Sequence, residues 1–293
     1  MALRRVLLLL ITATCSAQPS EYIITYDGLT NEELKTKCDL LNCSRIFSNV
    51  IQGLVVSKDP LAVSSLSVDD PSVQDMTPNS QVTLYQDPMS ESVQDATGAF
   101  VTNSSVLPYH LDRIDQLTLP LDGKYTPYND CRDVTIYIVD TGVWANHTEF
   151  IDADSGLSRV RPGYAAGRIT GDGTSDCAGH GTFVASMAAG RTVGVCSKAT
   201  IVPVAVLGCG GEGPISQIVE GLEWIVADAT NPNRTNTSSV IISKPTMNAD
   251  QFQDANISLL ACQLFVMLVS LVASLLIASR KPTAADFAVA QKR

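Results

Sequence analysis

Asp140 is one of two residues in this sequence whose type and position best suit acid–base chemistry. It follows the continuous apolar run 134–139 and is followed by Thr141 and Gly142. A short apolar run of this kind predicts a buried strand. The sequence therefore predicts a carboxylate at the carboxyl end of a strand, with a glycine that permits the turn after it.

His180 is the second candidate, in the string Gly179-His-Gly-Thr182 at the start of a predicted helix of small residues, 181–189. The positive end of a helix dipole favours the neutral imidazole that a general base needs. Taken alone, an aspartate at a strand end is often only a turn former, and a lone histidine is more often structural than catalytic. The pair is more specific than either residue.

The elements that must position this pair alternate between strands and helices from Pro108 onward. We expect strands at 134–139 and 200–207, helices at 181–189 and 215–229, and a further strand that starts at 240–242. Continuous apolar strands alternating with helices indicate an α/β fold, with a parallel sheet covered by helices on both faces. In open sheets of this type, functional residues gather at the carboxyl ends of the strands.

Aspartic proteases are one class to consider, because an apolar run followed by Asp-Thr-Gly is also their signature. Asp154-Ser-Gly156 supplies a second carboxylate. Two carboxylates that share a proton come from two separate lobes, and Asp140 and Asp154 are too close in sequence for that. This interpretation also leaves His180 without a role.

The two motifs resemble those of the subtilisin-like serine proteases, most closely the proteinase K group. Asp140-Thr-Gly is similar to the Asp motif of the family, and Asp176-Cys-Ala-Gly-His180-Gly-Thr to its His motif, with Phe183 where a second histidine is commoner. The resemblance implies a Ser-His-Asp triad in which Asp140 orients His180 and His180 takes the serine proton. It also implies a disulfide between Cys177 and Cys209, a pair that some members use.

The segment Val206-Leu-Gly-Cys-Gly-Gly-Glu-Gly213 is similar to the substrate-binding edge of that family. The resemblance implies that Gly211, Glu212 and Gly213 pair with an extended peptide or protein substrate by β-augmentation. Calcium is common in the family, but no ligand can be placed in this sequence. No cofactor or metal site is assigned.

Residues 21–86 form a separate region of short strands and helical patterns. We expect a small α+β domain with the order strand, helix, strand, helix, strand, at 22–25, 31–41, 51–57, 59–68 and 81–85. It resembles the propeptide of the family, a folding assistant and intramolecular inhibitor whose C-terminal end lies in the cleft. Cys38 and Cys43 are close enough in sequence to pair. Residues 87–107 are rich in Ser, Thr, Gln and Asp and indicate an exposed linker.

The third member of the triad has no match. The family motif Gly-Thr-Ser-Met-Ala does not occur after His180, and neither does the Ala-Ala-Gly-Asn that supplies an oxyanion donor. Without the serine there is no acyl-enzyme, and loss of the oxyanion donor removes about 3 kcal/mol of transition-state stabilisation. The sequence therefore predicts a C-terminally truncated, incomplete peptidase domain over 108–250 that is inactive as written.

The N-terminal residues indicate the compartment. Two arginines, a short apolar run and small residues before position 17 predict a signal peptide over 1–17. Export suits the eight cysteines and the Asn-x-Ser/Thr sequons, which lie at Asn42, Asn103, Asn146, Asn233, Asn236 and Asn256. With a net charge of −10 and no basic cluster, binding to nucleic acid through charge is excluded.

The apolar segment 257–279, followed by basic residues, is long enough to span a bilayer. It has two interpretations, a membrane anchor or the product of a shifted reading frame. If it is an anchor, the chain could be a membrane-anchored, non-catalytic binding protein that retains the propeptide and half of a domain. The sequence therefore predicts a protein of the secretory pathway that is either extracellular or membrane-anchored.

Overall fold

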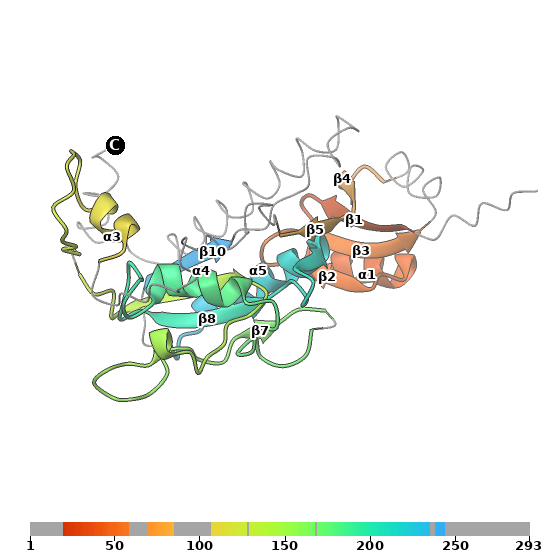
Figure 1. The fold of residues 1–293 in the computed structure, drawn as a ribbon. Helices are drawn as coiled ribbons and strands as arrows, with labels where there is room; N and C mark the ends of the chain where they lie inside the picture. Colours follow the sequence, from red (N-terminus) through yellow and green to blue (C-terminus); the bar gives the residue numbers. More distant parts are fainter. Residues whose placement is uncertain are drawn as a thin grey trace, which may run out of the picture.

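The computed structural model describes residues 20–58, 70–84, 107–127, 129–167, 169–234 and 238–243. Within these ranges the chain forms two bodies, each built on its own sheet (Figure 1). The predicted signal peptide, the helix at 59–68, nearly all of the linker and the apolar segment 257–279 lie outside the described residues.

The N-terminal body is an antiparallel sheet with one described helix. Its strands stand in the order β2-β3-β1-β4. In chain order its elements are β1 (Ser20–Tyr26), α1 (Asn31–Leu41), β2 (Arg45–Phe47), β3 (Gly53–Lys58) and β4 (Val73–Pro78). Helix α1 has the predicted bounds because Thr30 and Glu33 form a capping box, and it buries Leu34 against the sheet. The α+β character of this region is therefore as expected.

The strand expected at 81–85 does not join the sheet of this body. The third expected strand forms as β5 (Gln81–Thr83), but it pairs with β9 (Glu212–Pro214) of the second body rather than with this sheet. Strands β2 and β4, which the sequence analysis did not foresee, complete the sheet instead. The chain turns away after Pro78, because Asn79 binds Ser216 of the second body through both its side-chain oxygen and its side-chain nitrogen.

The parallel-sheet body has the strand order β10-β6-β8-β7, with all neighbours parallel. Its strands are β6 (Val134–Asp140), β7 (Tyr164–Ala165), β8 (Thr200–Ala205) and β10 (Ser238–Ser243). Its helices are α3 (Tyr109–Ile114), the 3-10 turn η1 (Thr148–Phe150), α4 (His180–Ala189) and α5 (Ile215–Ala229). Helix α5 has the predicted bounds, and β6 extends one residue beyond its prediction to include Asp140.

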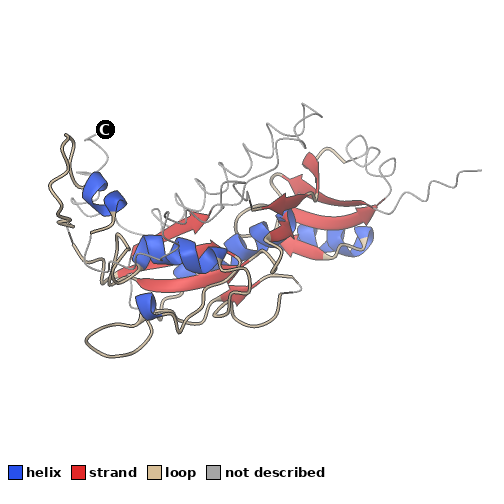
Figure 2. Cartoon of the chain, in the orientation of Figure 1, coloured by secondary structure: helices blue, strands red, loops and turns tan. Residues whose placement is uncertain are grey.

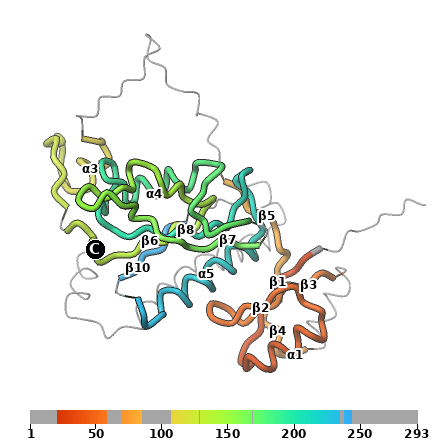
Figure 3. The backbone as a smooth tube through the Cα atoms, turned by 90° about the horizontal axis from the view of Figure 1, so that it is seen from below, coloured from red at the N-terminus to blue at the C-terminus, as the bar shows by residue number. Residues whose placement is uncertain are grey.

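Alternation along β6 places the two main helices, drawn in blue in Figure 2, on opposite faces of the parallel sheet. Figure 3 shows α4 on one side of β6 and β8 and α5 on the other. Ile136 and Ile138 belong to the apolar cluster that contains Ala185 of α4, whereas Tyr137 and Val139 belong to the cluster that contains Leu222 of α5. The expected α/β fold, with helices on both faces of a parallel sheet, is confirmed.

Helix α5 also joins the two bodies (Figure 3). One continuous apolar cluster includes Phe47 and Val82 from the N-terminal part of the chain together with Ile218 and Leu222 of α5. These side chains are at most 3% exposed. The interface therefore has a buried apolar centre, of the kind that stable assemblies use.

Three disulfides lie within the described residues: Cys38–Cys43, Cys131–Cys196 and Cys177–Cys209. The second was not foreseen and joins the segment before β6 to the segment before β8. Among the described helices, none has the length and apolarity that a bilayer span requires.

Candidate functional site

Asp140 and His180 meet where β6 ends and α4 begins. Nδ1 of His180 lies 2.8 and 2.9 Å from the two carboxylate oxygens of Asp140. The Asp140 side chain is 1% exposed, whereas that of His180 is 27% exposed. The backbone N–H of Thr141 also donates to the carboxylate, at 2.7 Å. The carboxylate is thus buried and hydrogen-bonded, and the imidazole reaches the surface.

This arrangement suits proton transfer. A carboxylate can only accept here, so Nδ1 carries the hydrogen and Nε2 of the neutral ring is left to accept a proton. The buried carboxylate fixes the ring orientation and stabilises the imidazolium that forms when Nε2 is protonated. The structure thus brings together the two residues that the sequence singled out, in a geometry that an orienting carboxylate and a general base require.

Glycines allow the strand end and the helix start to approach so closely. A Cβ on Gly181 would lie 2.0 Å from the carbonyl oxygen of Gly142 and 3.2 Å from the Cβ of Asp140. Gly142 itself has a φ of 112°, and a Cβ there would lie 2.1 Å from the carbonyl oxygen of Ser175. A larger residue at position 181 would push the helix start away from the strand end, and one at position 142 would push away the loop that contains Ser175.

Asp176, for which the sequence analysis gave no role, organises the loop before His180. Its Oδ1 accepts from the Thr141 hydroxyl and from the Gly179 N–H, both at 2.8 Å. Its Oδ2 accepts from the Thr182 N–H at 2.8 Å and from the Thr182 hydroxyl at 2.6 Å. Burial opposes ionisation of Asp176, but these hydrogen bonds outweigh it and hold its pKa below the usual value. An aspartate followed three residues later by glycine was the available turn signal.

The predicted substrate edge lies beside this pair and is occupied by the chain itself. Thr83 and Val82 of β5 stand opposite Glu212 and Gly213 of β9 in antiparallel register. The pairing continues one step further, where the Leu84 N–H donates to the Gly211 carbonyl at 2.8 Å. The structure therefore places Gly211, Glu212 and Gly213 in β-augmentation, with residues 81–84 as the added strand.

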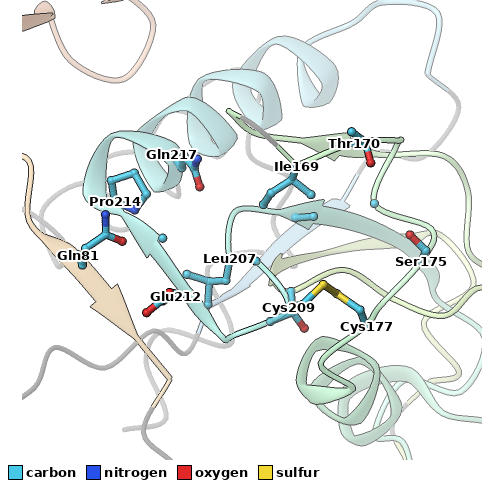
Figure 4. A pocket seen from close by; sticks show the side chains of 15 residues that line it. Gln81, Ile169, Thr170, Ser175, Cys177, Leu207, Cys209, Glu212, Pro214 and Gln217 are labelled. Carbon is cyan, nitrogen blue, oxygen red and sulfur yellow. A yellow bond between two sulfur atoms is a disulfide. The ribbon is translucent and has the colours of Figure 1, made fainter.

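A cavity of about 470 Å³ adjoins this edge. Figure 4 shows Gln81 of β5 on one side of it and the Cys177–Cys209 disulfide on another. Thr141, next to Asp140, is also part of its wall. The disulfide has the pairing that the resemblance implied, and it ties the loop before His180 to the segment before β9.

Carboxylates of α5 hold the N-terminal body in place. Glu223 accepts from the backbone N–H groups of Ser48, Asn49 and Val50 at 2.7 to 3.1 Å. Glu220 forms an ion pair with Arg45. Hydrogen bonds with an ionised partner are about twice as strong as neutral ones, so these two side chains give the apolar interface its orientation.

The structure gives no ligands for calcium within the described part of the chain. No group of three His, Cys, Asp or Glu side chains is placed there to hold a metal ion. The adjacent carboxylates Asp152 and Asp154 both bind the ammonium of Lys198, each at 3.0 Å. No calcium ligand is therefore assigned among the described residues.

Comparison with known proteins relates this architecture to peptidases. The model of the subtilase family matches residues 132–244. The chain is 39% identical to the extracellular serine proteinase of Thermus sp. over 174 residues, which is 57% of this chain and 40% of the relative. It is 35% identical to the alkaline serine exoprotease A of Vibrio alginolyticus over 193 residues, which is 66% of this chain and 33% of the relative. The chain thus spans less than half the length of each.

Among solved structures, the epidermin leader peptide processing serine protease of Staphylococcus aureus aligns with a TM-score of 0.55 and 12% identity. The alignment covers 90% of this chain and 59% of that one. At this identity the likeness concerns the fold alone. The region that matches the subtilase model, residues 132–244, contains Asp140, His180 and β9. Residues 132–244 of this chain are therefore similar to the subtilase family.

Proposed function

We propose that this chain is the N-terminal part of a subtilisin-like serine endopeptidase precursor. In this proposal residues 108–250 contribute the orienting carboxylate Asp140 and the general base His180. Residues 21–86 act as the propeptide, and residues 87–107 as the linker between them. The substrates are peptides or proteins that bind as an extended strand along β9.

The observation that carries the proposal is the Asp140–His180 hydrogen bond at the carboxyl end of β6. A peptidase is supported because Thr141, the neighbour of Asp140, lines the same cavity as β9, so a peptide held on β9 would lie along that cavity. That edge is filled by β5 in this chain. An intramolecular inhibitor blocks substrate in this way, so the pairing supports the propeptide role.

The polypeptide of residues 1–293 lacks the nucleophile motif after His180, so we propose that this polypeptide does not turn over substrate. An imidazole can activate a nucleophile only where one lies within hydrogen-bond reach. A non-catalytic binding protein anchored through residues 257–279 is the alternative that the sequence left open. No observation on the described residues favours it over the peptidase precursor.

We also propose secretion. The sequence begins with a signal-peptide pattern, and the relative from Thermus is named as extracellular. The described disulfides suit an oxidising compartment. Asn42, Asn146 and Asn233 are exposed in the structure, so the sequons at these positions are accessible for glycosylation in an exported protein.

A chimera tests the proposed function. Residues 1–243 would be joined to the segment that follows the corresponding strand in the Thermus proteinase, which supplies a serine. Once residues 1–107 have been cleaved from the chimera, we expect peptide hydrolysis and labelling by a serine-directed fluorophosphonate, both lost in a His180→Ala variant, and no labelling of the 293-residue chain. A labelled band from the 293-residue chain that disappears in His180→Ala would contradict the proposed inactivity, and would mean that another serine, such as Ser243, serves as nucleophile.

A second measurement covers the case in which the chimera does not fold. In the 293-residue chain, proton NMR should show the Nδ1 proton of His180 shifted downfield by its carboxylate partner. The signal should move upfield in an Asp140→Asn variant, whose amide is a weaker acceptor. An unchanged signal would contradict the assignment of Asp140 as the orienting group.

A further inference from the structure

Glu212 is the one charged residue among those that line the cavity beside the peptide edge. The remaining lining side chains are polar or apolar, and they include Gln81, Gln217, Leu207 and Thr141. Glu212 is also the central residue of the three that the sequence assigned to substrate binding. A single carboxylate in an otherwise uncharged wall dominates the local potential.

The register of the two strands fixes which peptide position faces Glu212. Thr83 lies directly opposite Glu212, and residues directly opposite each other in an antiparallel pair project their side chains on the same face. Figure 4 shows the Glu212 carboxylate directed from β9 toward the side on which β5 lies. A side chain at position 83 is therefore the neighbour of this carboxylate.

The Glu212 carboxylate is available for such a neighbour. Glu212 is exposed, and among the described residues no hydrogen bond or ion pair engages its carboxylate. A Cβ on Gly210 would lie 3.7 Å from its side-chain atoms, so the Glu212 side chain lies close to the Gly210 backbone. The Thr83 hydroxyl opposite it carries no charge. The strand that occupies the edge therefore leaves the negative charge uncompensated.

We infer that Glu212 makes this edge selective for peptides that carry lysine or arginine at the position occupied by Thr83. The inference rests on the proposed function, because it treats β5 as a stand-in for a bound substrate. Opposite charges directly across a strand pair attract, and exposed pairs of this kind change an equilibrium by about two- to fivefold. The propeptide strand, which is neutral at this position, is a weaker ligand than a basic peptide of the same length.

The experiment uses the full chain and measures hydrogen exchange at the amides of residues 82, 84 and 213, which face the partner strand in this register. We compare Thr83→Lys with Thr83→Gln, a neutral side chain that extends along the same path. Thr83→Lys should raise the protection of these amides about two- to fivefold over Thr83→Gln. The difference should vanish in a Glu212→Gln background and should shrink in 0.5 M salt, because an exposed ion pair is screened.

A competition assay extends the test to a peptide added in solution. Two synthetic peptides with the sequence of residues 81–84, one with Lys and one with Gln in place of Thr, would be titrated into the full chain. The Lys peptide should reduce the amide protection of β5 at a concentration about two- to fivefold lower than the Gln peptide. This difference should be absent in the Glu212→Gln variant.

The proposed selectivity would be overturned if lysine at position 83 raised amide protection equally in the Glu212→Gln background. It would also be overturned if lysine had no advantage over glutamine in either assay. Protection of the Leu84 amide in the unsubstituted chain separates this failure from that of the proposed function. If that amide is unprotected, β5 does not occupy the edge and the propeptide role itself fails.

Discussion

The Asp-His pair and the docking surface of the N-terminal body are held together in different ways. The pair is formed within one body by a strand end and a helix start, and glycines set its distance. The docking surface joins two bodies through an apolar cluster around α5, with Glu223 and Glu220 as polar anchors. The pair is therefore set by the packing of the parallel-sheet body, whereas the pairing of β5 with β9 depends on contacts between the bodies. Damage to one need not affect the other.

The largest expected effect breaks the parallel-sheet body and spares the N-terminal body. The Cys131–Cys196 bond joins residues that are 65 positions apart in the sequence, and the Cys38–Cys43 bond joins residues only 5 positions apart. By loop-closure entropy, replacing the first pair with serine should cost about 4 kcal/mol of unfolding free energy, and replacing the second about 2 kcal/mol. Denaturant unfolding of both double variants measures the difference. Equal losses would show that chain entropy does not govern these two disulfides.

The next largest effect should come from a substitution at the contact between α4 and β6, which positions Asp140 and His180. Gly181→Val places side-chain atoms against the Gly142 carbonyl, where even a Cβ would lie at 2.0 Å. We expect a loss of about 3 kcal/mol in unfolding free energy and loss of the downfield His180 proton signal, because the helix start must move away from β6.

Gly210→Ala is the matched control for that substitution. A Cβ on Gly210 would meet its nearest atoms at an ordinary 3.7 Å, so its effect should stay within about 0.5 kcal/mol. If Gly181→Val were as mild as this control, the close approach of α4 to β6 would not be what holds the pair.

The third effect falls on the docking surface alone. Glu223→Ala leaves three backbone N–H groups without their acceptor and should weaken docking by about 2 kcal/mol, or roughly thirtyfold in the opening equilibrium. Glu223→Gln keeps one oxygen acceptor, so its opening equilibrium should lie between those of the wild type and Glu223→Ala. Limited proteolysis within residues 44–58 measures opening, and the His180 proton signal should not change. A change in that signal would mean that the pair depends on docking after all.

Much of this architecture was predictable because the local patterns are strong. The apolar run before Asp140 and the amphipathic α5 both form at the expected places. The partner of β5 was not predictable from its own residues, because Gln81-Val-Thr83 has the same pattern in either sheet. Its destination depends on Asn79 and Ser216, which are distant in sequence and meet only in the folded chain. Short polar strands such as β4 also carry little hydrophobic periodicity, so sequence patterns miss them.

The candidate site shows the same division between local and long-range information. Asp140 and His180 stand out by motif, and the structure brings them together. Asp176 is equally central to the loop and begins the His motif, yet its sequence pattern indicates only a turn. Its importance comes from Thr141 and Thr182, two hydroxyl donors from separate elements that converge on one carboxylate.

The smallest expected effect concerns that carboxylate and depends on pH. The pKa of Asp176 is lowered in the folded chain, so its ionised form stabilises the fold. This contribution is fully present above the unfolded pKa of about 3.9 and is lost as the pH falls through the lower folded value. Asp176→Asn should therefore cost about 1 kcal/mol at pH 7 and progressively less below pH 4, where the carboxylate of the unfolded wild-type chain becomes protonated before that of the folded chain. Unfolding curves of both proteins between pH 2 and pH 7 give this difference directly.

The exposed substitution Asp39→Asn on α1 is the control and should stay within about 0.5 kcal/mol at neutral pH. A cost for Asp176→Asn that stays constant down to pH 2 would show that the charge of Asp176 contributes nothing, and that only its hydrogen-bonding shape holds the loop before His180.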